Sequence, residues 1–242
     1  SLNINGYYTK LKDVTEQSLF YSDIESSFAY VSLSGIKKEY YGVELGLNVK
    51  ATEWLDVKTL GTVSEAKYTN NANMRMLLSN SGNYVDELCI TEGMREGSTP
   101  LTAGSIDLSF HKNFWYIDLI GNYYDNIYMY FAPISRRDTE VRSDNKAFEW
   151  NSPAQAKGDG GFMLDASIGK TFRLRHGRRI GFNLMLTNIL NNINICTGGM
   201  EQNRLDTKQQ QERTNNAYRF EKSPRKFYAN GINGMLLINY QF

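Results

Sequence analysis

The feature that most constrains the fold is an alternation of apolar and polar residues with a period of two. In residues 41–50 the odd positions hold Tyr, Val and Leu, whereas the even positions hold Gly, Glu, Asn and Lys. Successive side chains of a β-strand point to opposite faces, so this pattern predicts a strand with one apolar and one polar face. The same alternation is strong in residues 162–172, 180–190 and 232–242, and weaker in 2–10, 55–63, 104–111 and 115–123.

These eight segments predict an all-β chain. Its 16 Tyr, 12 Phe and 20 Gly, with only four Pro, favour strands broken by turns over amphipathic helices. The sequence has no run of about eighteen uninterrupted apolar residues, which a spanning helix requires. If the chain enters a bilayer, we therefore expect it to do so as a closed antiparallel barrel.

The connections between the predicted strands alternate between long and short. The long ones cover residues 11–35, 71–100, 131–160 and 193–225, and the short ones lie near 51–53, 112–113 and 175–178. Outer-membrane barrels have tight periplasmic turns and long extracellular loops. We therefore predict a transmembrane β-barrel of the bacterial outer membrane, with the C-terminus on the periplasmic side and the four long loops outside.

The distribution of charge indicates which face meets lipid. Unpaired Lys or Arg on the lipid side near the midplane costs about 2–4 kcal/mol, so charged residues are expected on the lumenal face. This face is predicted to carry Glu44, Asp56, Lys58, Asp107, Asp118 and Asp165. Lys170 is the exception, and we expect its stem to extend to the periplasmic headgroups. Because a barrel of eight strands is just filled by its side chains, so many charges favour a fragment of a wider, wet barrel.

Aromatic residues at the outer end of the 115–123 segment are the candidate ligand contacts. Tyr124, Tyr128 and Tyr130, with the neighbouring Tyr123 and Phe131, can form a stacking platform for sugar rings or other flat groups. The alternative interpretation is the aromatic girdle of a membrane barrel, which we favour. Near the short turns, Trp54, Trp115 and Tyr116 are predicted to form the inner girdle.

Metal, cofactor and nucleic-acid functions are not indicated. Cys89 and Cys196 match no metal-ligand spacing and are either a loop disulfide or two inert thiols. The acids of the second loop match no calcium-binding pattern and are expected to be solvated: Asp86, Glu87, Glu92 and Glu96. A net charge of +1 gives no reason to expect nucleic acid. The basic run 173–179 is interpreted as a solvated hairpin, and the glycine-rich run 157–161 as a turn.

Catalysis is not expected either. The two histidines, His111 and His176, lie at or beside short turns, and no Ser or Cys stands at an informative spacing from them. We therefore predict no catalytic residue, no cofactor and no enzymatic activity.

Four short runs resemble the barrel of TonB-dependent receptors. Residues 182–192 contain Asn188-Ile189-Leu190-Asn191, which is similar to the N-[VIL]-L-[ND] signature of the penultimate strand. Residues 41–45 look like the recurring GVEL strand, and residues 162–172 resemble the DASxxKxF strand. The closing run resembles the signal read by the barrel-insertion machinery, carried by Leu236, Ile238, Tyr240 and Phe242. Together the matches cover residues 2–242 and are similar to receptors of Bacteroidota, including the SusC type.

The resemblance implies about the last eight strands of a barrel of about twenty-two strands, whose lumen holds a plug. It also implies outer-membrane lipid as the surroundings, energy supplied by TonB through N-terminal parts, and in many relatives a SusD-like surface lipoprotein. The chain begins at Ser1 without a signal peptide, plug or TonB box, so we expect an upstream part. The expected function is uptake of a glycan, peptide or chelate, with ligand contacts in 71–100, 131–160 and 193–225.

Two alternatives remain open from sequence. A complete eight-stranded outer-membrane barrel acting as an adhesin or structural anchor would have the same strand pattern. A soluble lipocalin-like binder would require the apolar faces to point inward.

Overall fold

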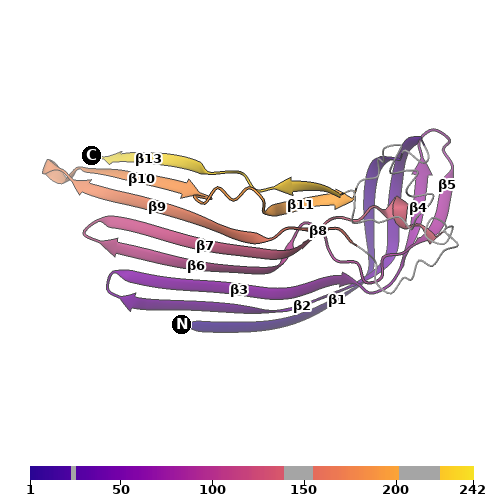
Figure 1. Ribbon diagram of the computed structural model, residues 1–242, viewed down its shortest axis with the longest axis horizontal. Helices are drawn as coiled ribbons and strands as arrows, with labels where there is room; N and C mark the ends of the chain where they lie inside the picture. Colours follow the sequence, from indigo (N-terminus) through magenta and orange to yellow (C-terminus); the bar gives the residue numbers. More distant parts are fainter. Residues whose placement is uncertain (23–25, 139–154, 202–223) are drawn as a thin grey trace.

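The structure is a computed structural model that describes residues 1–22, 26–138, 155–201 and 224–242. It is an all-β, antiparallel fold whose principal element is one large sheet (Figure 1). Eight of its strands follow one another across the sheet in chain order: β1 (Leu2–Ser22), β2 (Ser27–Thr52), β3 (Leu55–Tyr68), β6 (Pro100–Lys112), β7 (Trp115–Tyr128), β9 (Gly161–Arg173), β10 (Arg179–Thr187) and β13 (Asn233–Gln241). Each segment with the period-two alternation overlaps one of these strands.

The remaining elements lie in the long connections. They are β4 (Ala72–Leu78), β5 (Tyr84–Cys89), β8 (Lys157–Gly158), β11 (Cys196–Glu201), β12 (Pro224–Tyr228) and two 3-10 turns, η1 (Pro133–Arg136) and η2 (Arg175–Gly177). Strand β4 of the β4–β5 hairpin pairs with residues 29–34 of β2. Strands β11 and β12 form a separate two-stranded sheet. The prediction that 71–100 and 193–225 are loops is therefore wrong for the parts occupied by these strands.

The prediction of a long loop at 11–35 is also wrong. β1 and β2 pair from Leu2 opposite Leu47 to Ser22 opposite Ser27, so most of that segment is a hairpin. The alternation fails there because irregularities interrupt both strands. Gly35 has φ +67° and Asp13 has φ +56°, and the buried positions of β2 change from odd (Ala29, Val31, Leu33) to even (Ile36, Lys38). A bulge adds one residue to a strand and so shifts which side chains face inward.

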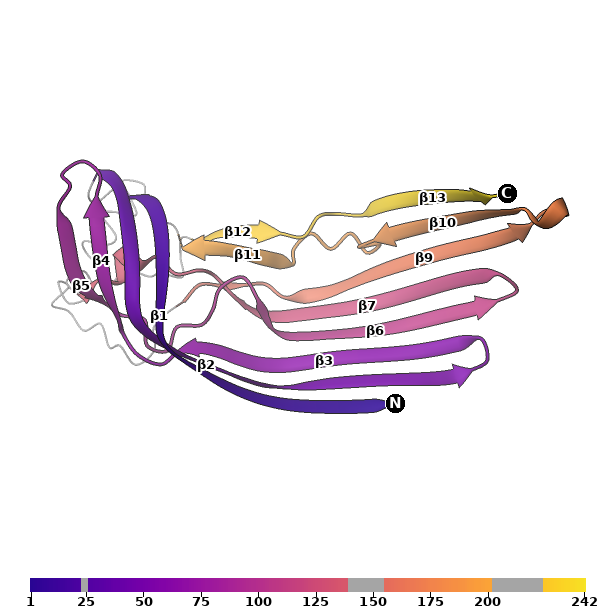
Figure 2. The ribbon, with the colours of Figure 1, turned by 180° about the vertical axis from the view of Figure 1, so that it is seen from behind.

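The short turns and the long connections lie at opposite ends of the sheet (Figure 1, Figure 2). Between β6 and β7, Asn113 and Phe114 both have positive φ, as a two-residue type I′ hairpin turn requires. His176 and Gly177 have positive φ between β9 and β10. The end of β10 differs from the prediction, because Asn188 takes a φ of +51° and Leu190 therefore lies outside the strand.

The sheet is open. Within the described residues β1 pairs only with β2 and β13 only with β10, so the two outer strands do not meet and no barrel is closed. The main hydrophobic core lies at the end of the sheet with the long connections, which we call the outer end. It is enclosed by the halves of β1 and β2 at this end, the β4–β5 hairpin and η1. Of the helical segments described, none is long and apolar enough to cross a bilayer.

Candidate functional site

The strand register brings one set of apolar residues from each of the eight strands onto the same face of the sheet, which we call the apolar flank. Leu45 stands opposite Ile4, and Leu108 stands between Val57 and Leu119. The neighbouring row runs from Ile117 of β7 through Ile168 and Leu184 to Leu236 on the last three strands. These side chains are not packed into a core, since Ile4, Val43 and Leu236 keep more than half of their surface exposed. The described chain therefore leaves a broad apolar face uncovered.

Aromatic side chains mark the turn end of the apolar flank. Trp54 stacks on Phe110 with ring centroids 5.9 Å apart, and Phe172 meets Phe182 edge-on at 6.1 Å. Trp115 lies in the same margin, opposite Lys170, whose ammonium is 4.3 Å from the centre of the Trp115 ring. The register places Tyr116 on the opposite face with Gly169, so its assignment to this girdle is wrong.

The outer margin of the flank carries a second set of rings. Tyr8 stands opposite Tyr41 on β1 and β2, and Tyr123 stands opposite Phe162 on β7 and β9. Along β7 the two margins are eight residue steps apart, from Trp115 to Tyr123. At about 3.3 Å per residue this is about 26 Å, close to the height of the apolar band of an outer-membrane barrel.

The opposite face, which we call the polar flank, contains all six charges expected there. Ser109 and Ser167 each donate a 2.7 Å hydrogen bond to the carboxylate of Asp118. Lys58 lies 3.6 Å from Asp107, and Asn122 donates to Asp165 at 3.2 Å. The charges are therefore tied into cross-strand contacts by short polar side chains that the sequence prediction did not single out.

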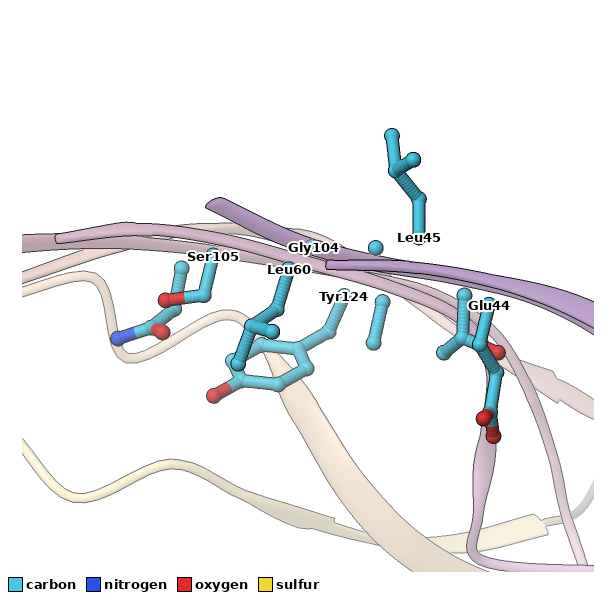
Figure 3. A pocket seen from close by; sticks show the side chains of 10 residues that line it. Glu44, Leu45, Leu60, Gly104, Ser105 and Tyr124 are labelled. Carbon is cyan, nitrogen blue, oxygen red and sulfur yellow. The ribbon is translucent and has the colours of Figure 1, made fainter. Parts of the chain in front are cut away.

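A shallow hollow of about 320 Å³ lies in the middle of the polar flank. Figure 3 shows Glu44, Leu60 and Tyr124 projecting to this side of the sheet, while Leu45 projects to the other. The close-up thus shows directly how adjacent residues of β2 are divided between the two flanks.

The three candidate stacking aromatics have different surroundings. Tyr124 lines the hollow on the polar flank. Tyr128 follows Asn126, which has φ +56°, and its ring lies under the Arg95 guanidinium at 4.9 Å. Tyr130 is more than half exposed and lines a separate cavity at the outer end. The three rings therefore do not form a single platform. Ligand binding by any of them stays a prediction.

The cavity at the outer end has a volume of about 370 Å³ and adjoins a charged cluster that the sequence did not reveal. Lys38 is buried between the carboxylates of Glu16 and Glu96 and donates a hydrogen bond to each. Burial alone would lower the pKa of Lys38, but these two hydrogen bonds outweigh it and raise the pKa. Tyr68 donates to Glu16 at 2.9 Å, and its ring lines the cavity together with Tyr130 and Phe131. No regular spacing links these residues in the chain.

A buried ion pair fixes the segment after β7. Arg136 and Glu201 are almost fully buried, with Nη2 and Oε1 2.5 Å apart. Glu201 also accepts a 3.0 Å hydrogen bond from the backbone N–H of Ala132. The pair therefore joins η1 to β11 across 65 residues of sequence.

The two cysteines are free thiols, so the disulfide alternative is wrong. Cys89 packs into the outer core with Met74 and Ile134, whereas Cys196 packs with Ile127 and Met129 in a second cluster. Burial raises the pKa of Cys89 to about 12, which keeps the thiol protonated at neutral pH.

The acids of the second loop are largely engaged by cations. Asp86 pairs with Arg75, Glu87 with Arg137 and Glu96 with Lys38. In the part of the chain that the structure describes, no cluster of three or more potential metal ligands occurs. His111 lies 3.7 Å from Asp56 on the polar flank, and His176 sits in the η2 turn.

Comparison of the chain with protein-family models, with curated proteins and with solved structures found no match. The case for a function therefore rests on the geometry of the two flanks. An exposed apolar face, with aromatic margins and a polar reverse side, suits a wall between lipid and water.

Proposed function

We propose that this chain forms part of the wall of an outer-membrane β-barrel, in a TonB-dependent receptor of the SusC type or a related one. The apolar flank faces lipid, the polar flank faces a wet lumen, and the long connections lie outside the cell. The single observation that carries the proposal is the continuous exposed apolar flank across all eight consecutive strands. A water-soluble sheet would have to cover such a face.

The open edges support a fragment of a large barrel over a complete small one. β1 and β13 present unpaired backbone groups along their outer sides in the described structure. In hydrocarbon every backbone group must find a partner, so we infer that further strands continue the sheet on both sides until it closes. A closed eight-stranded adhesin or anchor would instead pair β1 with β13.

The last strand supports insertion by the barrel-assembly machinery. Leu236, Ile238 and Tyr240 of β13 stand opposite Leu184, Phe182 and Ile180, so all three belong to the apolar flank. Phe242 follows the strand and is almost fully exposed. These residues form the proposed assembly signal.

The role of the wall is passage and ligand contact, without chemistry of its own. In the proposed receptor, a nutrient such as a glycan, peptide or chelate enters at the outer end, where the Tyr130 cavity lies. TonB supplies energy through N-terminal parts, and a SusD-like lipoprotein is the proposed surface partner.

Single-cysteine scanning of β6 in the full-length protein, in intact outer membranes, tests the proposal. The matched positions are Ser105→Cys and Asp107→Cys on the polar flank, and Ile106→Cys and Leu108→Cys on the apolar flank. A water-soluble maleimide is expected to label positions 105 and 107, and quenching by nitroxide lipids is expected only for fluorophores at 106 and 108. The two native thiols are buried and serve as the unlabelled background. Equal aqueous labelling at all four positions would sink the proposal.

A further inference from the structure

Lysines replace aromatic residues on the apolar side of the sheet just beyond its outer margin. The Tyr8–Tyr41 pair is followed by a row in which Lys10, Glu39 and Lys67 stand directly opposite one another on β1, β2 and β3. Lys10 donates a 2.9 Å hydrogen bond to Glu39, and the Lys67 ammonium lies 5.6 Å from the centre of the Tyr41 ring. One carboxylate thus stands between two cations.

The next row holds two lysines and the acid Asp13. Leu11 stands opposite Lys38 and Val14 opposite Ile36, which places Lys12 and Asp13, the two residues of the β1 bulge, beside Lys37. Ile36 and Lys38 are buried on the face that packs on the core, whereas Lys12 and Lys37 are exposed on the opposite face. Among the described residues neither lysine has an ion-pair partner. Like charges on neighbouring strands destabilise each other, so an anion between them would be favoured.

The position of these four residues matches the headgroup zone of a membrane. At about 3.3 Å per residue, Lys10 lies about 7 Å and Lys12 about 13 Å beyond the Tyr8 girdle. The headgroup region adds roughly 5–8 Å on each side of the hydrocarbon, within reach of long lysine side chains. We propose that a lysine belt, made of Lys10, Lys12, Lys37 and Lys67, binds the phosphate groups of anionic lipid headgroups in the outer leaflet. This inference rests on the proposed membrane orientation.

Protection of a sheet edge does not explain the belt. Lysines on an exposed edge strand prevent association with other chains, and Lys10 and Lys12 are on the edge strand β1. Lys37 and Lys67, however, are on β2 and β3, which have neighbours on both sides. A row that crosses three strands at one level follows the membrane surface instead of the edge.

Lipid A, a glycolipid with two phosphate groups, is a suitable probe for the full-length protein in nanodiscs. The test variant is Lys12→Gln with Lys37→Gln. The matched control is Lys112→Gln with Arg178→Gln, which removes the same charge at the turn end. We expect the test variant to bind lipid A about thirtyfold more weakly, since each lysine near an anionic headgroup contributes roughly a fivefold factor. The control is expected to bind like the native protein.

Two further measurements separate the possible outcomes. Inorganic phosphate at millimolar concentration is expected not to displace lipid A, and displacement would overturn the lipid as the source of the anion. Unchanged lipid A binding by the test variant would overturn the belt itself. Heat-dependent mobility on a gel reports whether each variant forms a barrel. A native protein without that mobility would count against the proposed function, whereas intact mobility with unchanged binding would count against the belt alone.

Discussion

At the scale of single residues, burial decides which charge pairs matter. Arg136 and Glu201 are sealed in the outer end, whereas Arg75 and Asp86 form an exposed pair with two hydrogen bonds of 2.7 and 2.9 Å. The exposed pair has the better fork geometry, yet water screens it and its net contribution is expected to be small. Removing Glu201 from the buried pair breaks hydrogen bonds that water does not screen or replace.

Glu201→Gln should therefore destabilise the outer end by about 1–3 kcal/mol, because a neutral amide replaces the buried carboxylate that accepts hydrogen bonds from Arg136 and from the backbone N–H of Ala132. The measurement is hydrogen exchange of the β11 and η1 amides, which reports the free energy of local opening. Asp86→Asn is the control, with an expected change under about 1 kcal/mol. Equal decreases in the free energy of local opening in the two variants would contradict the prediction that the buried pair matters more than the exposed one.

At the scale of the elements, the body of the sheet was predictable from sequence and the outer end was not. The strands around Leu45, Ile168 and Leu184 have one apolar face and one polar face along their length, so their alternation is unbroken. Beyond Gly35 and Asp13 the bulges shift the inward positions by one residue, and a simple alternation can no longer be followed. The sequence pattern also predicts a loop where β4 and β5 form. These two strands, which flank the outer core, are only seven and six residues long, too short for a clear alternation.

The candidate site shows the same division. The sequence placed the six charges of the polar flank correctly because their positions follow from parity alone. The Lys38 cluster depends on contacts between Glu16, Lys38 and Glu96, which are 22 and 58 residues apart and belong to separate segments. Such long-range contacts leave no local signal, and the buried Arg136–Glu201 pair was missed for this reason.

Deletion of Gly35 tests the role of the bulge. Without this residue, Val31 and Leu33 should turn outward and Tyr30 should turn toward the core, because a slip of one residue exchanges the two faces of a strand. The outer core should then open and expose Cys89, which in the native protein is buried among its neighbours. We expect alkylation of Cys89 by iodoacetamide to rise at least tenfold. Deletion of Gly82, in the β4–β5 turn, is the control and should leave the core closed.

At the scale of the whole molecule, the open sheet predicts that residues 1–242 do not behave as an independent barrel. Two edges with unpaired backbone groups and a broad apolar flank favour association of the isolated chain with other copies. We expect it to aggregate or to fail to insert when refolded into detergent or lipid. A monodisperse species with heat-dependent mobility on a gel, seen by size-exclusion chromatography and electrophoresis, would contradict this prediction.

The two edge strands differ in length, so the strands that would pair with them must also differ in length. β1 has 21 residues, whereas β13 has nine. At about 3.3 Å per residue, a strand that satisfies the whole of β1 must extend about 70 Å, while one that satisfies β13 needs less than half of that. In the proposed barrel, the strand that joins β1 would therefore be more than twice as long as the strand that joins β13, so the two seams would close over unequal lengths.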